Sequence, residues 1–263
     1  MKHHDLDHFA AVAQECAEAA RRCVTPYFRA NLAIESKEDK SPVTKADREA
    51  EQAMRAILTR HFPHHGILGE ETGQAGNLSD EWLWILDPID GTRSFVTGRP
   101  AFCTLIALCH EGKPVLGIID QPITEERWVG LEGQETRFFS ARLPGIAGTR
   151  RCPALKQADL SCTSPDIIRP DYQQRFESLR KNVGRTSWGG DAYGYGLLTL
   201  GQIDLIAEDT LKLWDWAALV PVIKGAGGSI TDWNGHELTL ASDGSVLACG
   251  DPALLKEAVK ALS

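Results

Sequence analysis

The sequence of 263 residues lacks any apolar run long enough to cross a membrane. Its longest apolar runs, such as Leu83 to Leu86 and Phe102 to Cys109, are far shorter than the roughly 20 residues that a bilayer-spanning helix needs. The first residues, Met1 to Asp5, lead into a polar, alanine-rich helical pattern, without the apolar core and small-residue cleavage site of a secretory signal. We therefore expect neither a membrane partner nor secretion.

An excess of positive charge is also absent. The chain has 28 basic and 36 acidic side chains, which gives a formal net charge of -8, and it shows no local basic stripe. Such a charge balance repels the phosphate backbone of a nucleic acid. We expect no nucleic-acid partner.

The cysteines form no CxxC pair, and their number is odd. Scattered single cysteines fit reduced thiols, and hence a cytoplasmic location. They stand at positions 16, 23, 103, 109, 152, 162 and 249.

The composition is that of an ordinary globular protein, with 43% hydrophobic and 24% charged residues. A chain of this length buries a full core as one large domain or two close-packed subdomains. Apolar residues spaced three and four apart predict helices over Asp5–Phe28 and Ala46–Phe62. Short apolar runs between turns then predict a β-sheet. These runs are Gly66–Gly69, Trp82–Leu86, Phe102–Leu108, Val115–Pro122 and Arg127–Gly130.

A stretch rich in proline, glycine and arginine, Leu143–Pro153, predicts a connection between two halves, residues 1–145 and 146–263. In the second half strands alternate with helices, which predicts an α/β or α+β layered body. The predicted helices there are Asp171–Lys181, Tyr193–Leu200, Asp215–Ala226 and Ala253–Leu262.

The segment Trp82–Thr92 is the most informative, because an apolar strand runs directly into Asp87 and Asp90. Pro88 fixes one backbone angle and the glycine after Asp90 permits a tight bend. The two carboxylates and the carbonyl of Ile89 can therefore converge on one point, and such hard oxygen ligands suit Mg²⁺. A solvated turn in which both aspartates cap backbone groups explains this segment equally well.

Other acidic residues add to this pattern. Glu70 and Glu71 follow a short apolar run, so at least one of them faces the interior. Asp215 lies between two tryptophans at the start of an apolar helix, where an N-cap is the simpler interpretation. Asp47 also lies near a helix start, and its functional interpretation needs a partner such as Thr92.

Four motifs together resemble the inositol monophosphatase-like family, in the same order and spacing over nearly the whole chain. They are Pro42–Asp47, Gly69–Glu71, Trp84–Thr92 and Trp214–Ala218. The resemblance implies a layered α-β-α-β-α sandwich of the inositol monophosphatase and fructose bisphosphatase type. It also implies a homodimer, with two or three Mg²⁺ ions per active site between the two halves.

The resemblance assigns the metal ligands. Glu70, Asp87 and the carbonyl of Ile89 would hold one ion. Asp87, Asp90 and Asp215 would hold a second, and Glu70 would take part in a third, weaker site. The metals would neutralise the phosphoryl oxygens, lower the pKa of a bound water and stabilise the leaving alkoxide.

The resemblance also implies catalytic and phosphate-binding roles. Thr92, hydrogen-bonded to Asp47, would orient or activate the attacking water, and Glu70 counts with them as catalytic. The N–H groups of Gly91 and Thr92, at the start of a helical turn, would hold the phosphate. Arg93 belongs to the same substrate-binding segment.

Two further regions are similar to the histidinol-phosphate phosphatases of this family. The segment after the metal motif, Gly91–Pro100, differs from the Gly-Thr-Thr-Asn-Phe that inositol monophosphatases more often have. The segment Trp188–Leu198 looks like the Gly-Gly-Asp region of that subgroup. In this interpretation Asp191 and Glu208 bind the leaving group, and Asp215 counts with them as a substrate-binding residue. The alternative is that Gly189 and Gly190 are simple turn residues and that Asp191 caps a helix.

The implied activity is Mg²⁺-dependent hydrolysis of a small phosphomonoester, L-histidinol phosphate, to L-histidinol and phosphate, a step of histidine biosynthesis. An inositol-1-phosphatase or a broad phosphomonoesterase of the same fold is the nearest alternative. A regulatory or RNA-associated protein that has lost turnover is the alternative from another class, and the acidic charge and full set of metal ligands argue against it.

Overall fold

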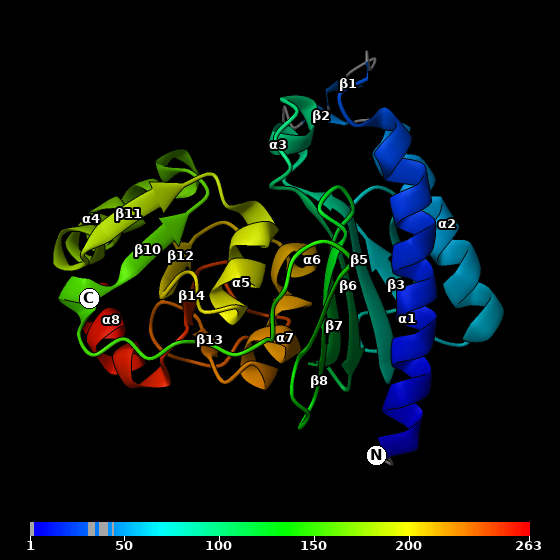
Figure 1. Cartoon of the computed structure of the whole chain (residues 1–263). Coiled ribbons are helices and arrows are strands. Elements are labelled where there is room, and N and C mark those ends of the chain that lie inside the picture. Colours follow the sequence, from blue (N-terminus) through cyan, green and yellow to red (C-terminus); the bar gives the residue numbers. More distant parts are fainter. Residues whose placement is uncertain (1–2, 31–34, 37–41, 44) are drawn as a thin grey trace.

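Helices and sheets of this chain alternate in five layers (Figure 1). The computed structural model describes residues 3–30, 35–36, 42–43 and 45–263. Helices α1 (His3–Val24) and α2 (Lys45–His61) form the first layer and pack on one face of the larger sheet. The layered α-β-α-β-α sandwich predicted from the sequence is therefore confirmed.

The larger sheet has seven strands, in the order β4-β3-β5-β6-β7-β8-β9, and only its β3–β5 pair is parallel. The strands are β3 (Gly66–Gly69), β4 (Gly73–Ala75), β5 (Trp82–Asp90), β6 (Cys103–His110), β7 (Lys113–Gln121), β8 (Glu126–Leu131) and β9 (Arg137–Ser140). All five strands predicted for this half are present. The short strands β4 and β9, which form the sheet edges, were not predicted.

The smaller sheet has five strands, in the order β11-β10-β12-β14-β13, with parallel and antiparallel pairs. The strands are β10 (Asp159–Cys162), β11 (Arg185–Trp188), β12 (Leu205–Glu208), β13 (Ser229–Thr231) and β14 (Val246–Cys249). Helices α5 (Asp191–Thr199), α6 (Leu213–Trp216) and α7 (Leu219–Gly225) lie between the two sheets, and α4 (Gln173–Asn182) and α8 (Leu255–Ala261) cover the outer face (Figure 1). Short elements complete the order: β1 (Glu35–Ser36) pairs with β2 (Pro42–Val43), and α3 (Thr92–Val96) follows β5.

Two of the predicted boundaries that differ from the structure bear on the site. The predicted helix Asp215–Ala226 is two helices, because α6 ends at Trp216 and α7 begins at Leu219. Pro221 explains the break, since proline has no N–H to donate to the carbonyl four residues earlier and its ring clashes with that carbonyl. The strand expected to end at Leu86 continues to Asp90, so both aspartates lie within β5.

The helical layer between the sheets lies very close to the larger sheet. A Cβ atom added to Gly117 on β7 would lie 1.9 Å from the carbonyl oxygen of Ala218, so only glycine fits there. Ala218 lies between α6 and α7. The contact therefore fixes the segment that contains Asp215 against the sheet that contains Asp87 and Asp90.

One hydrophobic cluster joins the two predicted halves. It includes Leu105 and Trp128 from residues 1–145 together with Tyr195 and Leu219 from residues 146–263. The irregular connection Leu143–Pro153 is present, while the division into two units stays a prediction. All seven cysteines are free thiols, and no helix in the described ranges is long and apolar enough to cross a membrane.

Candidate active site

Asp87 and Asp90 lie at an irregularity in the pairing of β5 with β6. Asp87 pairs with Leu105 and Asp90 with Cys103, so β5 has one residue more than β6 over this interval. In a regular strand, side chains three residues apart point to opposite faces. The extra residue is a β-bulge, which turns both carboxylates to the same side. Pro88 fits here, because proline within a sheet is confined to edges and bulges.

Asp215 reaches the same place from the second half of the chain. It is the third residue of α6, and its Oδ2 accepts a hydrogen bond of 2.6 Å from the N–H of Lys212. The capping interpretation of Asp215 was therefore correct in part. The side chain of Asp215 accepts a hydrogen bond at the start of α6 and also faces β5.

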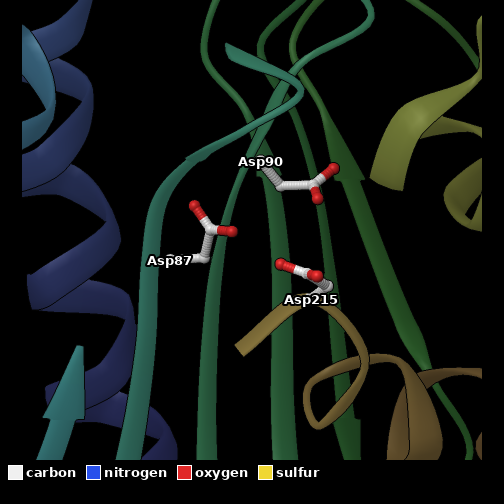
Figure 2. Close-up of side chains that lie close together, drawn as sticks. All are labelled: Asp87, Asp90 and Asp215. Atoms are coloured by element: carbon white, nitrogen blue, oxygen red, sulfur yellow. The ribbon is translucent and has the colours of Figure 1, made fainter. Parts of the chain in front are cut away.

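The three aspartates form a tight cluster. Carboxylate oxygens of Asp87, Asp90 and Asp215 lie within 4.8 Å of one another, and Figure 2 shows the side chains around a common space between β5 and α6. Burial, and then repulsion by neighbouring carboxylates, raises the pKa of Asp87 and Asp90 well above the ordinary value. Burial raises the pKa of Asp215 to about 7. The cluster therefore resists full ionisation without counter-charge.

A divalent cation fits this set of donors. Asp87 is 2% exposed, and its Oδ1 has no hydrogen-bond partner among residues 3–30, 35–36, 42–43 and 45–263. A buried carboxylate oxygen without a donor is costly unless a cation balances it. Oxygen-only ligands are those that Mg²⁺ prefers. The carbonyl of Ile89 adds a further oxygen beside the cluster, and it accepts one hydrogen bond of 3.2 Å from the Thr92 hydroxyl.

Glu70 lies on the turn after β3, and a buried side chain of α2 holds this turn. Glu51 is fully buried, and its Oε2 accepts a hydrogen bond of 2.7 Å from the N–H of Glu71. Its Oε1 accepts from the N–H of Thr72 at 3.1 Å and from Nε of Arg55 at 2.8 Å. The Glu51 carboxylate thus fixes the backbone directly after Glu70.

Glu51 was not predicted from the sequence, although a signal was present. It stands three residues before Met54 and seven before Leu58, on the apolar face of the predicted helix. A charged residue at such a position is seldom buried without a specific partner. Helical spacing alone could therefore have marked Glu51 as a candidate.

A cavity of about 510 Å³ opens beside the aspartate cluster. Candidate metal ligands and candidate leaving-group residues from both halves of the chain line this one cavity. The predicted site residues in its wall are Glu70, Asp90, Gly91, Thr92, Arg93, Asp191, Glu208 and Asp215. Thr163 and Tyr195, which were not predicted, also line it.

Glu208 is held in this wall by neutral donors. It is buried at the end of β12, where Oε1 accepts from the N–H of Thr163 at 2.7 Å and Oε2 accepts from the hydroxyl of Tyr195 at 3.0 Å. Burial raises the pKa of Glu208. Each carboxylate oxygen keeps a further lone pair, so Glu208 can accept another hydrogen bond from a ligand.

The alternative of Asp191 as a helix cap is wrong. The N-cap of α5 is Gly190, and the carboxylate of Asp191 instead accepts a hydrogen bond of 2.5 Å from the hydroxyl of Ser94 on α3. Burial raises the pKa of Asp191, an effect that Arg99 and Arg93 partly offset.

Asp47 lies in the first turn of α2, and its side chain is buried. Its charge contributes to the raised pKa of Asp87, which places it near the aspartate cluster. The hydroxyl of Thr92 donates to the Ile89 carbonyl, and its predicted hydrogen bond with Asp47 stays a prediction. Thr44 of the first motif lies outside the described residues.

Known proteins similar to this chain fall in one family. The profile of the inositol monophosphatase family matches residues 5–263. The bifunctional phosphatase IMPL2, chloroplastic, of Arabidopsis thaliana is 44% identical over 98% of this chain and 76% of that protein. A histidinol-phosphatase of Mycobacterium tuberculosis is 35% identical over 89% of this chain and 90% of its own. The structure of an inositol monophosphatase from Zymomonas mobilis matches with a TM-score of 0.87 and 46% identity, over 100% of this chain and 99% of that one.

The repulsion within the cluster predicts how Asp90→Asn changes stability. At about pH 8, the substitution should stabilise the chelator-treated protein by up to about 3 kcal/mol, the repulsion of two charges about 5 Å apart at an effective dielectric of about 20. The asparagine oxygen can still accept from the N–H of Ala192, so the fold should persist. Thermal unfolding with and without Mg²⁺ checks this. Mg²⁺ should raise the melting temperature of the wild type and much less that of the variant, and equal shifts would contradict a metal site here.

The position of Glu51 predicts an indirect effect on metal binding. Glu51→Gln replaces one acceptor oxygen by an amide donor, so a buried N–H of the turn after Glu70 loses its acceptor. Mg²⁺ affinity should fall by roughly tenfold or more, as is usual when a residue supporting a ligand is lost. Calorimetric titration with Mg²⁺ measures it. Glu49→Gln, on the same helix and bonded to Tyr27, is the matched control and should leave the affinity unchanged.

Proposed function

The chain belongs to the inositol monophosphatase family and is a phosphatase, and we propose that it hydrolyses L-histidinol phosphate to L-histidinol and phosphate with Mg²⁺. The observation that supports this substrate is the presence of Asp191 and Glu208 in the cavity that also contains Asp90 and Asp215. The leaving group of histidinol phosphate has an ammonium group and a basic imidazole. Carboxylates pair with such groups through charge-assisted hydrogen bonds, whereas an inositol ring offers only neutral hydroxyls.

In this proposal the aspartate cluster holds the metal. Asp87, Asp90 and Asp215, with Glu70 and the carbonyl of Ile89, bind two or three Mg²⁺ ions. The ions supply positive charge against the phosphoryl oxygens and activate a water molecule. The cluster at the end of β5 therefore determines where the phosphate lies.

The segment after β5 binds the phosphate and positions the water. The N–H groups of Gly91 and Thr92 donate to phosphoryl oxygens, and the guanidinium of Arg93, in the same cavity wall, pairs with them. The Thr92 hydroxyl, with Asp47 and Glu70, orients the water for attack. All of these residues belong to the first half of the chain: Asp47 lies on α2, Glu70 on the turn after β3, and Gly91, Thr92 and Arg93 at the start of α3.

An inositol phosphate is the second candidate substrate. It is favoured by the 46% identity with the Zymomonas mobilis protein, which is described as an inositol monophosphatase. The two candidates share the phosphate and metal chemistry and differ only in the leaving group. The acidic residues of the second half of the chain are therefore the place where they can be distinguished.

Three further expectations belong to this proposal. A role in histidine biosynthesis follows from the proposed substrate. A cytoplasmic location is in keeping with the seven free thiols, although one relative is named as chloroplastic. The homodimer can be tested by light scattering on the purified protein, and a monomer at working concentration would contradict it.

The leaving-group carboxylates predict a selective loss of activity. Asp191→Asn and Glu208→Gln should each lower kcat/KM for histidinol phosphate by roughly tenfold to a hundredfold, the effect of losing about 1.5 to 3 kcal/mol from a hydrogen bond to a charged group. Hydrolysis of glycerol phosphate, whose leaving group is neutral, should change much less. Phosphate release from a panel of histidinol, inositol and glycerol phosphates measures both.

Glu126→Gln is the matched control for Glu208→Gln. Glu126 is also buried and also accepts from a tyrosine hydroxyl, that of Tyr193 at 2.8 Å, but it lies outside the cavity wall. The Glu126→Gln variant should leave the ratio of kcat/KM between substrates unchanged. Equal losses on all substrates would assign the two acids to the fold or the metal site, and a wild type that prefers inositol phosphate would refute the proposed substrate.

The role proposed for Thr92 predicts a separate kinetic signature. Thr92→Ala removes the hydroxyl that positions the water but keeps the backbone N–H that binds phosphate. The value of kcat should therefore fall much more than KM rises. Steady-state kinetics at saturating Mg²⁺ measures both constants. A variant with unchanged kcat and a higher KM would restrict Thr92 to phosphate binding.

A further inference from the structure

The start of α5 lies directly against the segment that follows β5. Asp191 has a φ of 43° and Gly91 a φ of 84°, so both residues have left-handed backbones at this contact. A Cβ atom added to Gly91 would lie 2.9 Å from Cγ of Asp191, which explains why this position needs glycine. A residue other than glycine adopts a left-handed backbone at a cost, and such strain persists only where the surroundings enforce it.

Three hydrogen bonds enforce this arrangement. The hydroxyl of Ser94 donates to Oδ2 of Asp191 at 2.5 Å. The N–H of Asp191 donates to the hydroxyl oxygen of Thr163 at 3.0 Å, and the N–H of Ala192 donates to Oδ2 of Asp90 at 2.6 Å. The first and third bonds join the two halves of the chain. Ser94 on α3 therefore holds the side chain of Asp191, while Thr163, directly after β10, holds its backbone.

Ser94 has a specific place in this network. Its side chain is 1% exposed, so it is buried away from bulk water and its single proton goes to Asp191. A hydrogen bond from a hydroxyl to an ionised carboxylate is short and strong in such surroundings. In the described ranges, no hydrogen bond reaches Oδ1 of Asp191. One carboxylate oxygen is thus fixed while the other keeps its lone pairs for a ligand.

We propose that Ser94 is the positioning residue that aims Asp191 at the cationic leaving group. Ser94 lies on α3, two residues after Thr92 and one after Arg93, so the element proposed to bind phosphate also orients the carboxylate proposed to bind the leaving group. Recognition of the two ends of the substrate is therefore coupled through one hydrogen bond. This inference rests on the function proposed above, and it adds a residue that touches neither the phosphate nor the leaving group.

A double-mutant cycle tests the coupling. Ser94→Ala, Asp191→Asn and the double variant are compared by kcat/KM for histidinol phosphate and for glycerol phosphate, with Mg²⁺ present. Ser94→Ala should reduce the preference for histidinol phosphate by about tenfold, within the range for loss of a hydrogen bond to a charged group. In the Asp191→Asn background the same substitution should change the preference by less than about twofold, because the pair acts as a unit. The loss should appear in KM for histidinol phosphate more than in kcat.

Ser245→Ala is the matched control. Ser245 is also fully buried, and its hydroxyl also donates to an aspartate, Asp243, at 2.7 Å, but it lies outside the cavity wall. It should lower the melting temperature without changing the preference between substrates. If Ser94→Ala does not fold, Ser94→Cys, with a similar shape and a much weaker donor, takes its place in the cycle.

The possible outcomes separate the inference from the function on which it rests. A loss of preference in Asp191→Asn, with none in Ser94→Ala, would refute the role of Ser94 and leave the proposed substrate standing. Additive effects, or equal losses on both substrates, would show that Ser94 supports only the fold. No change of preference in Asp191→Asn would refute the leaving-group contact, and the role of Ser94 with it.

Discussion

Repulsion among three buried carboxylates is the interaction on which the site depends. Asp90 and Asp215 each accept a backbone N–H, from Ala192 and Lys212, and these bonds offset part of their negative charge. Oδ1 of Asp87 has no such donor in the described part of the chain. A cation would therefore contribute most at Asp87, which is one of the ligands that the family resemblance assigns to two metal ions. Backbone donors thus offset part of the charge of Asp90 and Asp215, and a bound cation would offset that of Asp87.

The same cluster joins the two halves of the molecule. Asp87 and Asp90 are brought together by a bulge within β5, whereas Asp215 is brought to them by the close contact of Ala218 with Gly117. Neither half contains a complete set of ligands. A bound metal would consequently link the halves, and any change in their packing would alter the distances among its ligands. This arrangement makes metal binding and the packing of the middle helical layer interdependent.

The sequence predicted those features that depend on local patterns. Apolar spacing located helices α1 and α2, and short apolar runs located the central strands. The bulge between Asp87 and Asp90 depends on pairing with β6, some fifteen residues further along the chain, and no local pattern specifies that register. The break before α7 could have been predicted from the sequence, because the ring of Pro221 clashes with the helical carbonyl four residues earlier. Ser94 was missed for a third reason, because its hydrogen-bond partner Asp191 lies 97 residues away in the sequence, whereas the position of Glu51 on the apolar face of a predicted helix could have marked it.

In the proposed function, the carboxylates of the cavity would favour a substrate with a cationic leaving group. Glu208 is held only by neutral donors, and the negative charge of Asp191 acts against its ionisation. Arg93 and Arg99 offset part of the charge on Asp191, and the hydrogen bonds from Thr163 and Tyr195 offset part of that on Glu208. A neutral leaving group can offer these carboxylates only hydroxyl donors, which form weaker hydrogen bonds than charged donors do. An ammonium or imidazolium group would supply the missing positive charge. Selection would then arise from the stronger hydrogen bonds that a cationic leaving group makes with these carboxylates.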